Sequence, residues 1–390
     1  MSRWREREIL GVTTAAFFVT MFARLVTSPL VPQITDAFSV SNGQVGLAFS
    51  GMWAAYALFQ FPGGVLADRI GETRVVSIAI GATGITTLAL GLSPTFPVFA
   101  ILAVGVGAAS GLYFTAGVAF LSNQFQNTGR ALGIHEIGAS AGGLVAPVAA
   151  AYLAARLDWR AGPLAATAIA VAALALFVWR APATSPENLD ASIRDQLNVR
   201  RLLDLLSRRT ILFTTAIAML GFFTWQAFAS FFPTFLVEYG GLSTSRASVI
   251  FGAVFAFTLV GSPALGRVSD TIGRDVVLGG AFLAGAAGYA TFLLGTGPFV
   301  HGGGVILVGL GLSWPGVMNS RFMDNLAPDE RGTGFGLVRT VVLLVSSLGS
   351  GVTGLLVDVA GWKTAYGFVA GLLGTLVVLL VLNRALGTNA

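Results

Sequence analysis

The chain has no cysteine, and only 11% of its 390 residues are charged. The absence of cysteine excludes disulfides, thiolate catalysis, iron–sulfur clusters and cysteine-bound zinc. Two histidines offer little for a metal site, so we expect neither a metal nor a cofactor. The sequence also contains no nucleophile–base pair and no phosphate-binding loop, so we expect no enzymatic activity. A soluble globular protein carries about 25% charged residues, and this composition excludes that class.

Hydrophobic residues replace the missing charge, since they make up 55% of the chain and give it a mean hydropathy of +0.79. The net charge of +5 is small and scattered, which argues against nucleic acid as a partner. The 50 glycines favour close packing between helices. This composition predicts a polytopic membrane protein that is surrounded by the lipid bilayer.

A helix needs about 20 apolar residues to cross the hydrocarbon core, and the chain contains twelve runs of about that length. They lie near residues 9–33, 44–67, 75–93, 96–122, 131–153, 161–180, 211–237, 246–267, 275–294, 299–320, 333–357 and 362–384. The sequence therefore predicts an all-α fold with twelve transmembrane helices.

The basic residues predict how these spans are oriented. An even number of spans places both termini on one side, where 17 of the 23 basic residues lie, against four on the other side. Because positively charged loops stay in the cytoplasm, we expect both termini to be cytoplasmic. Lys363 is the sole lysine, an arginine bias that indicates a GC-rich prokaryotic genome and hence the prokaryotic cell membrane.

One long polar connection, at residues 181–210, separates the first six spans from the last six. Its second half is amphipathic, because Val199, Leu202, Leu203 and Leu206 follow helical spacing among arginines. This helix either lies on the anionic inner leaflet or packs beneath the spans as an ordinary linker. The predicted domains are two six-helix bundles, at 1–180 and 211–390, joined by the linker at 181–210.

The two halves of the chain repeat one another. Residues 64–71 and 266–273 are identical at four positions with an offset of 202, and Trp159-Arg160 pairs with Trp362-Lys363 at an offset of 203. Six spans restore the original side of the membrane, so the halves have the same topology. The repeat predicts two bundles related by an axis along the membrane normal.

The loop after the second span, residues 63–74, resembles the signature loop of the major facilitator superfamily, and its echo follows the eighth span. With the twelve spans, the linker and the repeat, the resemblance extends over the whole chain. It implies a secondary transporter that works by alternating access, with a small molecule bound at one central site between two rocking bundles. We expect a monomer.

The resemblance also implies a role for the two loops. Asp68 would lie beside the start of span 11, and Asp270 beside the start of span 5, where a carboxylate gains about 0.3–1 kcal/mol from unpaired N–H groups. Such contacts would form a latch only while the cytoplasmic side is closed. The loop arginines either pair with acids and lipid phosphates or only fix the topology, and the glycines serve turn geometry. The residues of this predicted latch are Gly64, Asp68, Arg69, Gly71, Arg74, Asp270, Gly273 and Arg274.

Arg24 lies within the first span, near the membrane midplane, where a charge costs at least about 2.5 kcal/mol and indicates function by default. With Pro32 eight residues later, it is similar to the organophosphate antiporters and anion:cation symporters of the superfamily. This similarity implies that the guanidinium binds a substrate anion, because its planar fork can donate to two oxygens of a carboxylate or phosphate. Those families have Asn two residues after the Arg, where this chain has Val26. The alternative is a structural Arg satisfied by helix-end carbonyls or a nearby acid.

Glu136 on the fifth span and Arg339 on the eleventh correspond in the repeat. Arg339 is either a second anion ligand, with Glu136 carrying a coupling proton, or it forms a gate pair with Glu136; local backbone contacts for each are the third alternative. His135 is a candidate to share a proton, or else a packed, neutral side chain. Span 4 lacks the buried Arg of proton-coupled relatives at residues 100–110, which leaves Glu136 as the acid for any coupling.

The remaining candidates for substrate binding are polar and aromatic side chains on spans that line the cavity in the superfamily, although packing is the commoner role of buried aromatics. They are Tyr56, Gln60, Tyr113, Trp225, Gln226, Trp314 and Asn319. Span 5 also carries Gly138, Gly142, Gly143 and Pro147, which partly resembles the glycine signature of drug:proton antiporters. Packing of these small residues against span 8 is the simpler explanation.

Three functions follow in order of preference. The first is a secondary active transporter of a small organic anion: a sugar acid, a carboxylate or a phosphate ester. The second is an exporter that exchanges a drug or metabolite for protons. The third is a membrane sensor that does not transport.

Overall fold

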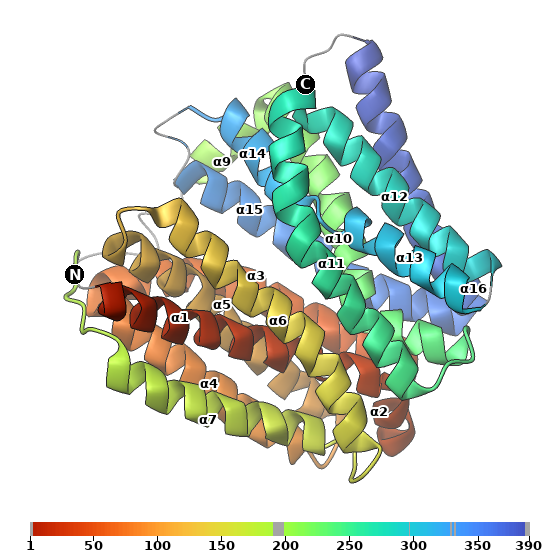
Figure 1. Ribbon diagram of the computed structural model, residues 1–390, viewed down its shortest axis with the longest axis horizontal. Helices are drawn as coiled ribbons and strands as arrows, with labels where there is room; N and C mark the ends of the chain where they lie inside the picture. The colour runs from red at the N-terminus through yellow and green to blue at the C-terminus, as the bar shows by residue number, and fades with distance from the viewer. Residues whose placement is uncertain (1–2, 190–198, 296, 328–329, 331–332, 387–390) are drawn as a thin grey trace. The chain divides into compact units, whose positions relative to one another are not determined.

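The computed structural model describes all residues except 1–2, 190–198, 296, 328–329, 331–332 and 387–390 (Figure 1). Helices are the regular secondary structure of the described residues. The chain divides into two compact units. Unit 1 comprises residues 1–40 and 48–196, and unit 2 comprises residues 41–47 and 197–390.

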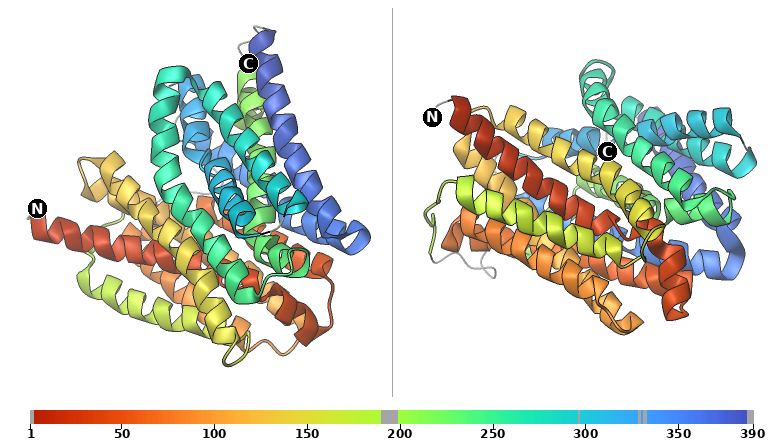
Figure 2. Two further views of the ribbon diagram at one scale, coloured as in Figure 1. Left: turned by 45° about the vertical axis from the view of Figure 1, so that its right-hand side comes forward. Right: turned by 60° about the horizontal axis from the view of Figure 1, so that its bottom comes forward.

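Unit 1 is a bundle of long helices in which α1 packs along α6 and α7, and α4 along α5 and α7 (Figures 1 and 2). Its elements in chain order are α1 (Arg3–Leu25), the 3-10 turn η1 (Ser28–Leu30), α2 (Val31–Phe38), α3 (Asn42–Ile70), α4 (Glu72–Gly91), α5 (Phe96–Gln124), α6 (Thr128–Ala154) and α7 (Ala161–Arg180). Residues 41–47, at the start of α3, group with unit 2, where the Gly43 N–H donates to Asp358 Oδ2 at 2.8 Å.

In unit 2, α10 packs along α15 and α16, while α12 packs along α13 and α16. Its elements are α9 (Val199–Ser207), α10 (Arg209–Glu238), α11 (Thr244–Ile272), α12 (Arg274–Leu294), α13 (Pro298–Gly311), α14 (Pro315–Asn325), α15 (Thr333–Ser346) and α16 (Leu348–Ala385). Within α16, Gly361 has a φ of +77° and kinks the helix.

The helices agree with the twelve predicted spans in number and order. Ten described segments are long and apolar enough to cross a membrane, and the last of them, Gly334–Ala385, contains spans 11 and 12 on either side of the Gly361 kink. Span 2 is the 29-residue α3, which is less apolar than the ten because it carries polar residues such as Ser50 and Gln60. This is the all-α architecture that the sequence predicts.

Three spans are interrupted where the sequence predicts continuous helices. Span 1 stops at Leu25 and resumes through η1 and α2, because Pro29 and Pro32 cannot continue the hydrogen bonding of α1. Span 10 breaks between α13 and α14, before Pro315, and span 11 breaks at Ser347. Interrupted helices mark binding sites in many transporters, because their free backbone groups need partners.

Glycines set the spacing of the helices in unit 1. A Cβ on Gly138 would collide with the Thr14 carbonyl oxygen, and one on Gly142 would lie 2.9 Å from Met21 Cβ. These glycines therefore hold α6 against α1, which is span 1. The sequence predicts instead that they pack against span 8. The same device holds α5 against α3, because a Cβ on Gly107 would collide with the Met52 carbonyl oxygen.

The predicted linker has two described parts, while residues 190–198 lie outside the described residues. Residues 181–189 lie on the turn between α3 and α4, where Thr73 Oγ1 donates to the Pro182 carbonyl at 2.7 Å. The helix α9 packs on α10 and α15 through the fully buried Leu205, which is not one of the four apolar residues that define the predicted face. Leu203 of that face is 61% exposed. The helix α9 thus packs on α10 and α15, and its position on the inner leaflet remains a prediction.

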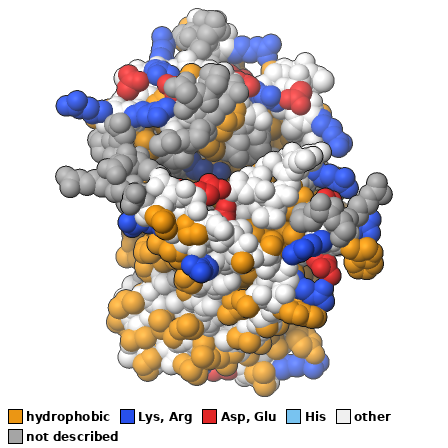
Figure 3. All heavy atoms as spheres, turned by 90° about the vertical axis from the view of Figure 1, so that its left-hand side faces the viewer, with side chains coloured by type: hydrophobic (Ala, Val, Ile, Leu, Met, Phe, Trp, Pro, Cys, Tyr) orange, Lys and Arg blue, Asp and Glu red, His pale blue; other side chains and the backbone are white. Residues whose placement is uncertain are grey.

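Unit 1 carries exposed hydrophobic side chains on its outer helices. Hydrophobic side chains gather over the lower part of Figure 3, on the side where α4 and α7 lie in Figure 1. Exposed apolar side chains on these helices, such as Ile85 and Val171, suit contact with lipid.

Replacing Gly138 by Ala should separate α6 from α1 and destabilise the protein by about 1–3 kcal/mol, because the new methyl group has no space. Gly133→Ala on the same helix is the matched control, since nothing lies within 4 Å of its Cβ position. That variant should be neutral or more stable, because Ala favours helix. Thermal unfolding of both variants in detergent measures the difference, and equal midpoints would contradict the packing role of Gly138.

Candidate functional site

The candidate site in unit 1 is built around Arg24, which occupies the last turn of α1 and is only 3% exposed. The chain leaves the helix directly after this residue, so the unpaired carbonyls of the helix end favour a cation there. Its Nε donates to the Thr20 carbonyl at 3.1 Å. This bond fixes the plane of the guanidinium and leaves its outer edge for other partners.

One face of α3 covers the guanidinium. Trp53, Tyr56 and Gln60 are spaced i, i+3 and i+7, which places them on the same side of the helix. Arg24 Cζ lies 4.2 Å from the centroid of the Tyr56 ring and 5.2 Å from that of Trp53. Cation–π contacts of this kind offset part of the cost of removing the charge from water.

Two donors at this site have no hydrogen-bond partner. They are Arg24 Nη2 and Gln60 Nε2, on side chains that are 3% and 6% exposed. A buried donor without an acceptor costs about 1–3 kcal/mol, and more if it is charged. The negative charge that acts on Arg24 from within unit 1 is that of Glu136, which lies on α6 with its side chain exposed. The site is therefore cationic and has unused donors.

Tyr113 and His135 contact each other inside the core of unit 1, and their roles in substrate binding and coupling remain predictions. Tyr113 is fully buried, and its hydroxyl donates to the Thr13 carbonyl at 2.7 Å. The Tyr113 oxygen must then accept from His135 Nε2, 2.8 Å away, which fixes the histidine tautomer. His135 Nδ1 is buried without a partner, and the ring stacks on Phe17 at 4.4 Å. A second proton on this histidine would have no acceptor.

Unit 2 holds the other predicted binding residues. Gln226 is 3% exposed and its Oε1 has no partner, whereas Trp225, Asn319 and Arg339 are half-buried. Trp314 precedes the first residue of α14 and is fully buried, with its ring 4.8 Å from Phe222. This packing makes Trp314 a core residue of unit 2.

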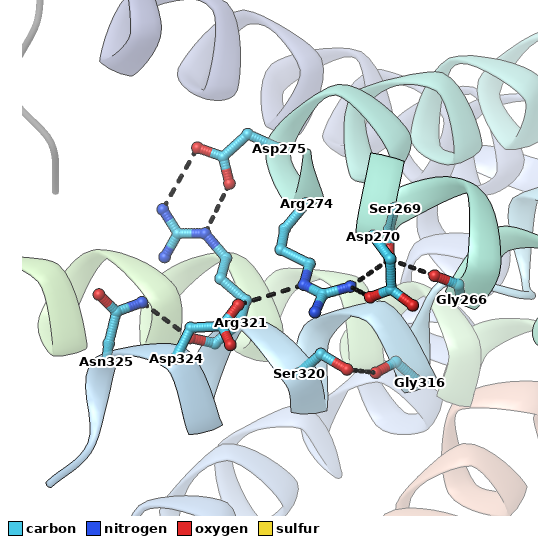
Figure 4. A network of polar contacts seen from close by, with 10 residues as sticks. All are labelled: Gly266, Ser269, Asp270, Arg274, Asp275, Gly316, Ser320, Arg321, Asp324 and Asn325. Atoms are coloured by element: carbon cyan, nitrogen blue, oxygen red, sulfur yellow. Dashed lines mark hydrogen bonds and ion pairs between the residues drawn. The ribbon is translucent and has the colours of Figure 1, made fainter. Parts of the chain in front are cut away.

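The loop after α11 is held by an ionic network (Figure 4). Arg274 pairs with Asp270, donates to Ser269 Oγ at 2.6 Å, and reaches Asp324 Oδ2 on α14 at 3.1 Å. The carboxylate of Asp270 is thus engaged by its own unit. Its proposed latch contact, like that of Asp68, remains a prediction.

Sequence reasoning missed a second pair in this network. Arg321 is 5% exposed and donates to both carboxylate oxygens of Asp275, at 2.6 and 3.4 Å (Figure 4). It also contacts Thr214. In the sequence, Asp275 and Arg321 are each only a charged residue near the end of a predicted span. Such charges fit a topology marker equally well, so their pairing was not predictable.

A further ionic pair joins Arg208, the residue before α10, to the connection before α15. Arg208 donates bidentately to Glu330, from Nη1 at 2.8 Å and from Nη2 at 2.7 Å. This guanidinium, together with the Ala327 N–H, holds the pKa of Glu330 below its ordinary value. The pair therefore has a structural role in unit 2.

The loop after α3 is held by hydrogen bonds to the segment after α7. The Asp68 carbonyl accepts from the N–H groups of Glu187 and Asn188, both at 3.0 Å, and Arg69 Nε reaches the Leu189 carbonyl at 3.4 Å. Arg74 is exposed. A Cβ added to Gly64 would lie 4.0 Å from Thr115 Cβ. In unit 1 the segment after α7 therefore straps this loop.

The loop after α3 and the loop after α11 have the same backbone conformation at a glycine that the sequence repeat aligns. Gly71 has φ +90° and ψ +141°, and Gly273 has φ +96° and ψ +149°. This region of φ and ψ is essentially restricted to glycine. Both residues join two long helices end to end, which explains why glycine occupies both positions.

Comparisons with known proteins agree with this architecture. The family model described as Major Facilitator Superfamily matches residues 13–349 and 241–388. The chain is 24% identical over 384 residues to a hexuronate transporter of Bacillus subtilis (strain 168), covering 92% of this chain and 90% of that protein. It is also 24% identical to the fosmidomycin resistance protein of Escherichia coli (strain K12), over 96% of this chain and 93% of that one. The crystal structure of the nucleoside transporter NupG has the same fold, with a TM-score of 0.79, 16% identity and coverage of 97% and 98%.

The paired glycines allow a controlled test of the strap. Gly71→Ala should lose more stability than Gly273→Ala, because both impose about 1–3 kcal/mol of backbone strain but only the first also brings a Cβ to 2.5 Å from the Thr184 carbonyl oxygen. Thermal unfolding measures the difference, and proteolysis within residues 181–189 should accelerate in Gly71→Ala alone. Equal effects of the two substitutions would show that the strap adds nothing.

Proposed function

The chain belongs to the major facilitator superfamily, and we propose that this multi-pass membrane transporter moves a small organic anion across the prokaryotic cytoplasmic membrane. Transport would proceed by alternating access, and the substrate would be a sugar acid, another carboxylate or a phosphate ester. Both termini would face the cytoplasm, as the distribution of arginine predicts.

The observation that carries this proposal is the unused donor edge of Arg24. A buried guanidinium with an unpartnered Nη2, on a face of α3 that also carries the unpartnered amide of Gln60, is complementary to an acceptor with two oxygens. A carboxylate or phosphate supplies such oxygens and also neutralises the charge. The hexuronate transporter of B. subtilis supports this choice of substrate, since a hexuronate is a sugar that carries one carboxylate.

The aromatic side chains fit the rest of such a substrate. Trp53 and Tyr56 present ring faces beside the guanidinium, and rings of this kind also stack on the apolar faces of sugars. Gln60 would bond a hydroxyl or the second carboxylate oxygen. From the other half of the chain, we propose that Arg339, Trp225, Gln226 and Asn319 complete the site during the cycle.

Arg24→Ala should weaken binding of a labelled hexuronate by at least about 10-fold, which is the value of a charge-assisted hydrogen bond of about 1.5–3 kcal/mol. Arg24→Lys should weaken binding to a similar extent, because lysine keeps the charge but lacks the planar guanidinium. Arg156→Ala is the matched control, since Arg156 also lies over a tyrosine ring, at 4.3 Å, but at an exposed position.

Binding is measured on the purified proteins and counterflow in proteoliposomes. Unchanged affinity in both Arg24 variants, with the fold intact, would overturn the anion site and leave Arg24 a structural residue.

A drug or metabolite exporter is the second candidate, and the full-length similarity to a fosmidomycin resistance protein favours it. Counterflow separates the two: labelled organic anions should exchange under the first proposal, and labelled cationic dyes under the second. A membrane sensor would show neither.

Glu136 should act as a gate residue, because it lies on α6 with an exposed side chain and interacts electrostatically with Arg24. We expect Glu136→Gln to impair both exchange and accumulation driven by a pH gradient, while Glu6→Gln, in the first turn of α1, changes neither. Both modes are measured in the same vesicles. Normal exchange with loss of accumulation would instead make Glu136 the proton carrier, and wild-type activity in both modes would leave it without either role.

A further inference from the structure

Unit 2 contains a cavity of about 790 Å³ between the connection from α10 to α11 and the connection from α12 to α13. Its lining is mostly apolar, with Leu242, Val249, Ile250 and Pro298 among the contributing residues. A volume of this size is typical of small-molecule sites. The residues of the site around Arg24 do not line it.

The polar side chains that line the cavity are either basic or neutral. Arg246 and His301 line it, together with Ser245, and none of the residues that line it is acidic. The Arg246 side chain is exposed, and no ion pair engages it within the described part of the chain. Arg246 and Ser245 lie in the first turn of α11, and Pro298 begins α13, so two helix N-termini add positive potential.

The surroundings of the cavity are suited to the boundary between lipid and water. Val249 on its wall is 55% exposed, and the nearby Leu294 and Phe299, at the ends of α12 and α13, are 82% and 94% exposed. Such apolar side chains at span ends face acyl chains, whereas a free arginine at the same level faces headgroups. Under the predicted orientation this boundary belongs to the outer leaflet.

We infer that this cavity binds an anionic phospholipid, with the upper part of an acyl chain against Val249 and Ile250 and the phosphate against Arg246. An apolar wall with a cationic rim is complementary to an amphipathic anion. A small polar anion, such as the proposed substrate, would leave the apolar wall unfilled. The inference concerns a site separate from the proposed transport site and does not depend on it.

The test uses the purified full-length protein and native mass spectrometry with dioleoyl phosphatidylglycerol and dioleoyl phosphatidylcholine, which share acyl chains but differ in net charge. The wild type should retain phosphatidylglycerol about tenfold more strongly than phosphatidylcholine. Arg246→Ala should lose this preference, and Arg246→Lys should keep most of it, because a phosphate accepts from either cation. Arg156→Ala, at another exposed arginine, should behave as the wild type.

A second variant tests the apolar part of the site. Val249→Trp should reduce retention of both lipids, because the larger side chain fills the volume while Arg246 keeps its charge. Inorganic phosphate at millimolar concentration should not displace the lipid. Equal retention by wild type and Arg246→Ala, an equal loss in Arg156→Ala, or displacement by phosphate alone would each overturn the proposal.

Discussion

Burial of the Arg24 guanidinium in a membrane-spanning unit costs at least about 2.5 kcal/mol, and the surrounding helices compensate for it only in part. The Thr20 carbonyl takes one donor and two aromatic faces cover the plane, but Nη2 keeps no partner. A fully satisfied arginine would be a structural element. The unused donor of Arg24 is the reason for proposing that a substrate anion binds there.

The position of Arg24 depends on helices that approach unusually closely. Gly138 and Gly142 let α6 lie directly on α1, while Gly107 lets α5 lie on α3. These contacts fix α1 and α3, the two helices that supply the arginine and its aromatic cover. The helix α1 then stops at Leu25, ahead of Pro29, so that Arg24 lies in its last turn, where a cation is favoured. Packing of small residues and one helix break thus produce the electrostatics of the site.

Much of this architecture could be predicted because it depends on local patterns. Apolar runs predict the spans, and the repeat aligns Gly71 with Gly273, both of which have positive φ. The resemblance of residues 63–74 to a family loop predicts the family. Arg24 could be singled out because a charge within a span is conspicuous in any sequence. Each of these inferences uses residues close together in the chain, or two halves compared with each other.

The rest depended on contacts between distant residues, which no local pattern encodes. The Tyr113–His135 hydrogen bond, the Arg321–Asp275 pair and the helix on which Gly138 packs are of this kind. Tyr113 looks like a cavity residue by span and spacing, yet both of its polar contacts lie inside the core of unit 1. A side chain's span does not reveal which way it faces when the helix is apolar on all sides.

The repeat also shows that shared backbone geometry does not imply shared chemistry. Gly71 and Gly273 make the same turn, but the first loop is strapped by backbone hydrogen bonds from residues 181–189, and the second is held by ionic pairs of Arg274. Hydrogen bonds to a strap are lost together when the segment detaches, whereas exposed ion pairs exchange partners individually and weaken with salt. The two halves of the chain therefore hold equivalent glycine turns by different sets of contacts.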